Sequence, residues 1–518
     1  MIDASGTTIY SYLAGGLLYT EDGPWASDTL TNLYWNGMRT NLSLQQPTGV
    51  WTNRFGWDAA KRLTNVTSQA GSFTNEYFAG VGGASGYSSH LIKRLLLPNL
   101  SIITNDFDSV ARPLGTWLKT STGTLLDSAS YGYNSGDQRT TFTNAAGTYY
   151  QYTYDNISQL KVADSSVNTE DRGYLYDAAW NLNKRTNNGV TTTFSVDTKN
   201  QLTGGPGAPF VYDNNGNLTS SQNAMQIYTY DDENRLISVQ FYTTWKTEFV
   251  YDGLGRLRKR LEYAPVGTLN STTEYIYEGM RVIQERDGSN TPQVSYTRGT
   301  DLSGTFEGAG GIGGLLARSY GYSGGNWSTH NSYHADGNGN ITYLVNSSQT
   351  LAASYRYDPF GNTMSSSGTL ASANVYRFSS KEIHANSGMY YYLYRFYDPN
   401  LQRWINRDPV EEEGGNNLYG FVGNDPISSA DPVGLWFGYP WPIPKPQPQP
   451  PPPIIIYNPR PGIDYTPGNN FPGPYSCPLP LPKPPSTNAP PTTTPPTNAP
   501  PTNAPPPKSR SSNSPAGP

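Results

Sequence analysis

Hydrophobic and polar residues alternate over short stretches of this chain, and these stretches recur in a fixed order. One nine-residue unit stands out in five copies: YTYDNISQL from Tyr152, YLYDAAWNL from Tyr174, FVYDNNGNL from Phe210, YTYDDENRL from Tyr228 and FVYDGLGRL from Phe249. The aspartates of this region recur every 16 to 22 residues. Side chains alternate between the two faces of a strand, so aromatic–x–aromatic places two rings on one face.

The aspartate of each unit predicts a tight turn. Asp is favoured at the first position of a turn, where its carboxylate bonds backbone N–H groups two residues on. Gly, Asn or a small residue follows three positions later, as in the run Asp252 to Gly255. That residue fits the last position of a type I turn, and Leu257 then re-enters the apolar face. The spacing therefore predicts consecutive antiparallel hairpins.

Two other interpretations of the repeat remain open. A calcium array would need several carboxylates in each turn, whereas most copies supply one. The aromatic rings are expected to be stacked core and cross-strand pairs, with carbohydrate-binding platforms as the alternative.

Composition supports an all-β body followed by a C-terminal segment of very different, proline-rich composition. Gly and Pro make up 96 of 518 residues, which argues against long helices. Thirty of the 43 prolines lie between Pro440 and Pro518, a composition that predicts disorder with extended polyproline II segments. Cys477, the single cysteine, lies in this tail and excludes a disulfide framework and a Cys-based zinc site.

Charge and hydropathy exclude further classes of protein. The tail carries five Lys or Arg and one Asp, so the net charge of −5 leaves about −9 on the body. An acidic body without clustered Lys and Arg is a poor nucleic-acid ligand. No stretch reaches the roughly 18 apolar residues of a membrane helix. Met1 to Gly23 lacks Lys and Arg, so we expect any export to use a route without a recognisable signal peptide.

The aromatic-Asp unit resembles the YD repeat of the Rhs (rearrangement hot spot) family, which includes the C-components of insecticidal toxin complexes and is related to teneurins. The segment 355–435 resembles the repeat-associated core domain of that family more closely. The matching words are YYYLYRFYDP from Tyr390, RDP from Arg407, GGNNLYGFVGNDP from Gly414 and DPVGL from Asp431. The resemblance implies a spiralling β-shell whose core domain acts as an aspartyl protease on its own chain.

Carried over by position, the resemblance implies Arg395, Asp408 and Asp431 as catalytic residues and a cut between Leu435 and Trp436. Hydrolysis by carboxylates needs two of them close enough to share a proton. An adjacent Arg would hold one carboxylate ionised and could polarise a carbonyl. The alternative is that Asp408 and Asp431 only open turns, as Asp-Pro pairs do elsewhere in the chain.

Other candidate sites are weaker. His330 and His334 lie four apart, but outside a helical pattern, so we expect no metal and no cofactor. The glycine-rich run Gly310 to Arg318 lacks the Lys-Ser/Thr ending of a phosphate loop. The charged run Arg256 to Arg260 is expected to be a solvated strand face.

These observations predict an uncertain segment 1–50, a repeat shell over 51–354, the core domain over 355–435 and a disordered tail over 436–518. The predicted function is that of a shell protein of a toxin-delivery or contact-dependent competition system. Its expected partners are its own tail as passenger, a second shell component, secretion machinery or carbohydrate, and its expected place is secreted or on the cell surface after synthesis in the cytoplasm. The alternatives are a surface adhesion or sugar-binding protein without proteolysis, and a degenerate fragment without activity.

Overall fold

The computed structural model describes residues 1–79, 88–435 and 439–440, and within these ranges it is built from strands and short 3-10 helices. The all-β prediction is confirmed. Predictions that concern Trp436, Cys477 and the Pro-rich tail lie outside the described residues.

The first long run of strands pairs each strand antiparallel with the next along the chain. Its members are β3 (Ile9–Tyr12), β4 (Leu18–Asp22), β5 (Leu30–Trp35), β6 (Met38–Gln45), β7 (Val50–Trp57), β8 (Leu63–Ser68), β9 (Gly71–Ala79), β10 (Ser88–Leu96), β11 (Ile102–Phe107), β12 (Pro113–Lys119), β13 (Leu125–Tyr133), β14 (Arg139–Asn144), β15 (Tyr149–Tyr154), β16 (Leu160–Ser165), β17 (Arg172–Tyr176), β18 (Leu182–Asn187) and β19 (Val190–Thr193).

The second long run follows the same rule. It consists of β22 (Val211–Tyr212), β23 (Leu218–Ser221), β24 (Gln226–Tyr230), β25 (Leu236–Phe241), β26 (Trp245–Tyr251), β27 (Leu257–Tyr263), β28 (Leu269–Glu278), β29 (Arg281–Asp287), β30 (Pro292–Arg298), β31 (Leu315–Ser323), β32 (Asn326–Ala335), β33 (Ile341–Asn346), β34 (Leu351–Tyr357) and β35 (Thr363–Ser367).

The remaining elements are short. They are β1 (Ile2–Asp3), β2 (Gly6–Thr7), β20 (Ser195–Val196), β21 (Leu202–Gly204), β36 (Glu382–Ile383), β37 (Tyr390–Tyr391), β38 (Phe396–Asp398), β39 (Arg403–Trp404), β40 (Ser429–Ala430), β41 (Tyr439–Pro440), and the 3-10 helices η1 (Asn168–Glu170), η2 (Phe378–Ser380), η3 (Glu411–Gly414) and η4 (Val422–Asn424).

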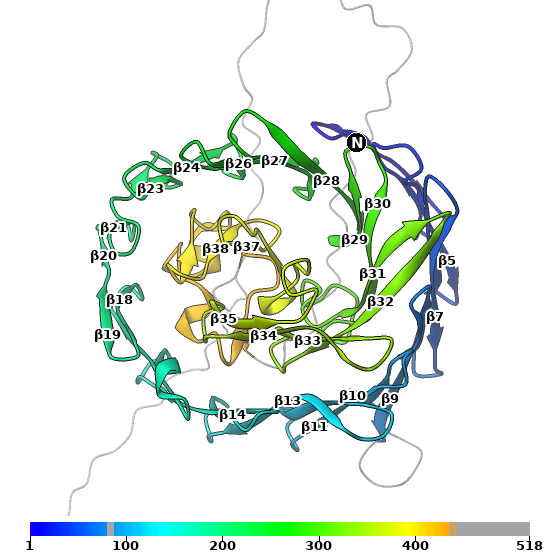
Figure 1. Ribbon diagram of the computed structural model, residues 1–518, viewed down its shortest axis with the longest axis horizontal. Helices are drawn as coiled ribbons and strands as arrows, with labels where there is room; N and C mark the ends of the chain where they lie inside the picture. The colour runs from blue at the N-terminus through cyan, green and yellow to red at the C-terminus, as the bar shows by residue number, and fades with distance from the viewer. Residues whose placement is uncertain (80–87, 436–438, 441–518) are drawn as a thin grey trace, which may run out of the picture. The chain divides into compact units, whose positions relative to one another are not determined.

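The strands form a spiral, as predicted. In Figure 1 they run once around from β5 through β14, β19 and β24 to β28, and then continue inside the first strands as β29 to β35. The two layers share a core in which Leu42, Trp51 and Phe55 of the outer strands pack with Ile283 and Trp327 of the inner ones. Where the wall is two layers deep, the inner strands β29 and β30 are therefore largely buried on both faces.

The repeat aspartate builds the predicted turn. Asp252 Oδ1 accepts the N–H groups of Leu254 and Arg256, each at 3.0 Å, and the N–H of Gly255 donates to the Asp252 carbonyl. Gly255 has φ +78°, the left-handed conformation that glycine adopts without steric cost. The same two side-chain bonds recur at Asp58, Asp108, Asp155, Asp177, Asp197, Asp213, Asp231, Asp287, Asp336 and Asp358.

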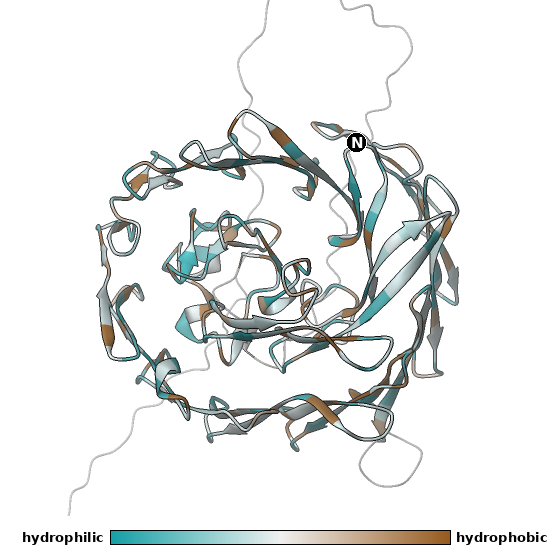
Figure 2. Cartoon of the chain, in the orientation of Figure 1, coloured by the Kyte–Doolittle hydropathy of each residue, from teal (hydrophilic) through white to brown (hydrophobic). Residues whose placement is uncertain are grey.

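The aromatic pairs lie on one strand face, as predicted. The rings of Tyr174 and Tyr176 stack with centroids 6.5 Å apart, and those of Tyr355 and Tyr357 do so at 6.3 Å. Tyr174 and Tyr355 are buried. In Figure 2 the hydrophobic stretches are short and interspersed with hydrophilic ones, so the core depends on these rings rather than on long apolar strands.

The hydroxyl of the tyrosine before the aspartate has a second function that the repeat pattern does not reveal. It donates to a backbone carbonyl of the preceding repeat, at the apolar residue where that repeat re-enters its strand. The pairs are Tyr176 with Leu160, Tyr230 with Leu218, Tyr251 with Leu236 and Tyr357 with Ile341, at 2.7 to 3.0 Å. Each repeat is thereby joined to the one before it.

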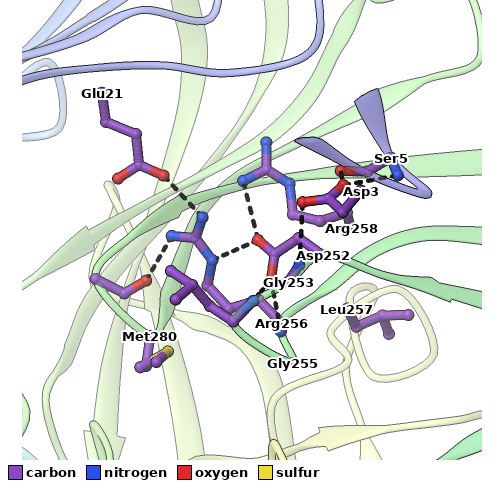
Figure 3. A network of polar contacts seen from close by, with 12 residues as sticks. Asp3, Ser5, Glu21, Asp252, Gly253, Gly255, Arg256, Leu257, Arg258 and Met280 are labelled. Atoms are coloured by element: carbon purple, nitrogen blue, oxygen red, sulfur yellow. Dashed lines mark hydrogen bonds and ion pairs between the residues drawn. The ribbon is translucent and has the colours of Figure 1, made fainter. Parts of the chain in front are cut away.

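The expectation that Arg256 to Arg260 is a solvated face is wrong. Figure 3 shows Arg256 between Asp252 and Glu21, with nitrogen–oxygen distances of 2.7 and 2.8 Å, and its side chain is only 1% exposed. Arg258 lies 4.7 Å from the ring of Trp25. The N-terminal strands cover β27 in the spiral, and their carboxylates and rings replace the water that would otherwise solvate these cations.

The segment after β35 occupies the middle of the spiral (Figure 1). It has little regular structure, but Tyr390, Tyr397 and Phe421 are almost fully buried and pack with Tyr150 and Tyr174 of the wall. Aromatic contacts rather than strand pairing therefore hold this segment in place. No helix among the described residues has the length and apolar character needed to cross a membrane.

We predict that Tyr251→Phe destabilises the protein by about 1 kcal/mol, because it removes a buried hydrogen bond while keeping the ring. The control is Tyr149→Phe, whose ring is 48% exposed and which should change stability by less than about 0.5 kcal/mol. Urea unfolding of both variants measures the difference. Equal midpoints would contradict a stabilising role for the hydroxyl.

Candidate active site

The structure brings together the three side chains that the resemblance singled out. Arg395 directly precedes β38, Asp408 follows β39, and Asp431 follows β40. The Nη2 of Arg395 lies 2.7 Å from Asp408 Oδ2 and 3.9 Å from Asp431 Oδ2. One guanidinium thus contacts two carboxylates that are 23 residues apart in the sequence.

Arg395 is held on every side. Its Nη1 donates to the Leu418 carbonyl at 3.2 Å, its Nε donates to the Gly434 carbonyl, and its guanidinium lies 4.3 Å from the ring of Trp404. Burial lowers the pKa of Arg395 to about 10, while Asp408 and Asp431 oppose that shift. The group is therefore a fixed cation at neutral pH.

Asp431 is enclosed by the turn that it opens. Its Oδ1 accepts the backbone N–H groups of Val433, Gly434 and Leu435 at 3.1, 2.7 and 3.3 Å. Successive N–H groups that converge in this way form a concavity suited to negative charge. The side chain is fully buried. Asp431 is therefore a turn former, as the alternative interpretation holds, and it also faces Arg395.

Asp408 has a different environment. Its Oδ1 accepts the Val410 N–H at 3.0 Å, and its Oδ2 faces Arg395. Burial raises the pKa of the Asp408 carboxyl, Asp431 adds to the rise, and Arg395 opposes it. Asp408 is thus the carboxyl that retains a proton to higher pH than an ordinary aspartate does.

The Leu435 carbonyl lies beside Asp408, with Gly414 between them. A Cβ atom on Gly414 would be 2.5 Å from Asp408 Oδ2 and 2.9 Å from the Leu435 oxygen. Both oxygens therefore face the same small space, which stays open because residue 414 has no side chain. No role for this glycine follows from the sequence, although it begins the matched word GGNNLYGFVGNDP.

Lys381 is a second residue at this turn whose role does not follow from the sequence. Its Nζ donates to the carbonyl of Pro432 at 2.6 Å and to that of Gly310 at 2.9 Å. Gly310 opens the glycine-rich run Gly310 to Arg318, and strand β31 begins within this run at Leu315. The run packs against the DPVGL word, with Ala309 and Ile312 buried against Ala430.

The other Asp-Pro aspartates cap turns of their own. Asp358, Asp398 and Asp425 accept backbone N–H groups within the next four residues. Among the described residues, Asp408 and Asp431 are the Asp-Pro aspartates that form an ion pair with Arg395. Each of the five motifs therefore forms a turn of its own, and Asp408 and Asp431 also contact the same cation, Arg395.

The histidines of the weaker candidate site have other partners. His330 Nδ1 lies 2.8 Å from Ser319 Oγ, and His334 Nδ1 lies 2.8 Å from Asp127 Oδ2. Over the ranges that the structure describes, no three His, Cys, Asp or Glu side chains converge to form a metal site.

Comparison with known proteins finds one family model and several bacterial proteins to which parts of the chain are similar. The family model described as Teneurin YD-shell matches residues 135–280. The tRNA3(Ser)-specific nuclease WapA of Bacillus spizizenii is 28% identical over 318 residues, which cover 59% of this chain and 12% of that protein. The double-stranded DNA deaminase toxin A of Burkholderia cenocepacia is 26% identical over 323 residues, covering 59% and 22%.

A third relative and a solved structure belong to toxin complexes. Toxin subunit YenC1 of Yersinia entomophaga is 39% identical over 98 residues, covering 18% of this chain and 10% of that protein. The crystal structure of TcdB2-TccC3 matches with a TM-score of 0.60 and 18% identity over 83% of this chain and 26% of that one. The structural likeness concerns the fold, and the chain spans less than a quarter of the length of the three sequence relatives.

We predict that Arg395→Met destabilises the fold at pH 7 by about 3–5 kcal/mol, because it leaves buried carboxylates without their cation. The cost should shrink on acidification, since the raised pKa of Asp408 allows this carboxyl to become neutral early. Urea unfolding at pH 7 and pH 4 measures both effects. The control is Arg54→Met, an exposed position at which we expect little change; a pH-independent loss at Arg395 would contradict the electrostatic explanation.

Proposed function

Because the chain is a YD-repeat shell protein of the Rhs type, we propose that it serves a toxin-delivery or contact-dependent competition system and cuts its own chain once, between Leu435 and Trp436. The position of the Leu435 carbonyl beside Asp408, with Arg395 contacting both aspartates, is the observation that supports this most.

The proposed reaction is hydrolysis of one peptide bond. Asp431, whose carboxylate form is favoured by its three N–H donors, takes a proton from a water molecule, whose oxygen adds to the Leu435 carbonyl carbon. Asp408, in the fraction of molecules in which its raised pKa leaves it protonated, donates to the carbonyl oxygen. The tetrahedral intermediate then collapses: the C–N bond breaks, Asp431 passes the proton that it took from water to the Trp436 nitrogen, and a hydroxyl of the intermediate returns a proton to Asp408. One water is consumed, and the Leu435 carboxylic acid then loses its proton to the Trp436 amine, which gives a carboxylate and an ammonium group. Two carboxyls held in opposite protonation states are what this chemistry needs.

The cut would separate the passenger segment 436–518 from the shell. The relatives are named for nuclease and deaminase activities, but this segment contains 30 prolines and no recognisable catalytic constellation. The proposal therefore includes delivery and release, and does not include a toxin activity of this segment. The structure of TcdB2-TccC3 is named for two proteins, and by analogy we propose a second shell component as partner and export from the cell as the route.

We predict that the full wild-type chain, expressed and analysed by intact mass, yields two fragments that meet at Leu435–Trp436. Asp408→Asn and Asp431→Asn should each give one chain of 56.8 kDa, since each variant removes a carboxyl that the reaction needs. Asp425→Asn is the matched control, because Asp425 caps an Asp-Pro turn away from Arg395 and should leave cleavage intact. A folded wild-type chain that stays whole would overturn the proposal.

We also predict that Gly414→Ala slows cleavage by at least about tenfold, because its methyl group would push Asp408 away from the Leu435 carbonyl. Gly173→Ala is the control, since the nearest atom to its Cβ would lie 3.5 Å away, an ordinary contact. The uncut fraction at fixed times after synthesis measures the rate. Cleavage of both variants at the wild-type rate would show that the space at Gly414 is irrelevant.

A further inference from the structure

We propose that Lys381 is a positioning residue for this cleavage: it holds the Pro432 carbonyl and thereby fixes the turn that carries both Asp431 and Leu435. The inference rests on the proposed self-cleavage and adds a further residue to it. Lys381 is neither of the two reacting aspartates, and it lies outside the matched words of the sequence.

The contacts of Lys381 point at the turn rather than at a counter-ion. Two of its three ammonium donors go to backbone carbonyls, those of Pro432 and Gly310. No ion pair of Lys381 is present in the described part of the chain, and the ring of Tyr392 lies 5.3 Å from Nζ. A cation with this set of partners acts as a tether between two backbone segments.

Two cations donate hydrogen bonds to backbone carbonyls of this turn. Lys381 holds the carbonyl of Pro432, while the Nε of Arg395 holds the carbonyl of Gly434. Asp431 collects the N–H groups of residues 433 to 435 from inside the turn. The backbone that leads to Leu435 is therefore fixed by two cationic donors and one carboxylate acceptor. A reacting carbonyl must be positioned precisely, and these contacts provide that positioning.

The glycine-rich run closes the turn from the other side. Gly310 has φ +58°, and a Cβ atom there would lie 1.9 Å from the Pro432 oxygen. The Lys381 tether can therefore form only because residue 310 lacks a side chain. Asp301 supports this run by accepting the N–H groups of Ala309 and Gly311 at 2.7 and 3.1 Å.

Burial disfavours the charged form of Lys381, so its effect on cleavage should depend on pH. Burial lowers the pKa of Lys381 to about 7 and Arg298 acts in the same direction, while Asp431 and Asp301 oppose the shift. Lys381 and Pro432 line a cavity of about 120 Å³, and the further charged groups that line it are Arg281, Glu307 and Glu382. Below pH 7 Lys381 is the charged donor, and as the pH rises through 7 that charge is lost.

The test follows the conversion of freshly synthesised full-length chain to the 435-residue fragment in cell-free reactions, stopped and then held at pH 6 or pH 8. We expect Lys381→Met to slow cleavage by at least about tenfold at pH 6 and by less at pH 8, where the neutral amine still donates to both carbonyls but forms weaker hydrogen bonds. Taking the ratio of wild type to variant at each pH cancels the titration of Asp408, which both share. No slowing at either pH value would overturn the role of Lys381.

A matched pair of glycines tests the tether without changing a charge. Gly310→Ala should slow cleavage because its methyl group displaces the Pro432 carbonyl. Gly304→Ala carries the same backbone strain, with φ +75°, but has no atom within 4 Å of the added carbon and should cleave normally. Equal rates for these two variants would count against the proposal.

A readout that needs no cleavage separates this inference from the proposed function. In the Asp408→Asn background, hydrogen exchange of the amides of residues 433–435 should be faster when Lys381→Met is added. If wild type is not cut but exchange accelerates, the tether is correct and self-cleavage is wrong. If wild type is cut and exchange stays unchanged, the tether is wrong and self-cleavage stands.

Discussion

The bond from the tyrosine hydroxyl of one repeat to a carbonyl of the repeat before it is the interaction on which the rest of the structure depends. A single two-stranded hairpin is marginal in water, and only 35% of this chain is hydrophobic. A buried tyrosine contributes a large apolar ring and must also place its hydroxyl against a partner. At Tyr251 that partner is the Leu236 carbonyl, and Arg235 lies over the same ring while pairing with Asp231. The ring therefore joins the turn of one repeat to the strand of the next, and the same joint recurs along the wall.

The same joint recurs along a wall that curves (Figure 1), and the curvature brings segments that are far apart in the sequence into contact. The spiral returns its N-terminal strands over β27, where Glu21 and Arg256 meet although they are 235 residues apart. The same curvature surrounds the segment after Ser367, whose strands are two or three residues long and could not stand alone. Wall and centre are thus one cooperative core, and the candidate active site is a product of that core rather than of a local motif.

The sequence predicts what is local and misses what the spiral creates. The turns at Asp252 and its equivalents, the paired rings and the hairpin order follow from residue type and spacing, because the partners lie within a few positions of each other. Arg395, Asp408 and Asp431 came from resemblance, since no spacing rule brings residues 23 apart into contact. Arg256 was placed in solvent because its pattern is that of an exposed strand, and only the covering N-terminal strands reverse this. Gly414 and Lys381 gave no signal, because their importance lies in a space and in a carbonyl contributed by other segments.

The assembly of the site has a consequence for the order of events. The turn at residues 431–435 is held by Arg395 just before β38, by Lys381 just after η2, and by the Gly310 run between β30 and β31. These pieces meet only when the inner layer of the spiral is in place, and a nascent or misfolded chain has none of their contacts. Under the proposed function, the carboxyls would therefore acquire their opposite protonation states only in the folded shell. Cleavage would then follow folding. Before the shell is complete, Asp408 and Lys381 lack the burial that shifts their pKa values, so the protease would be inactive.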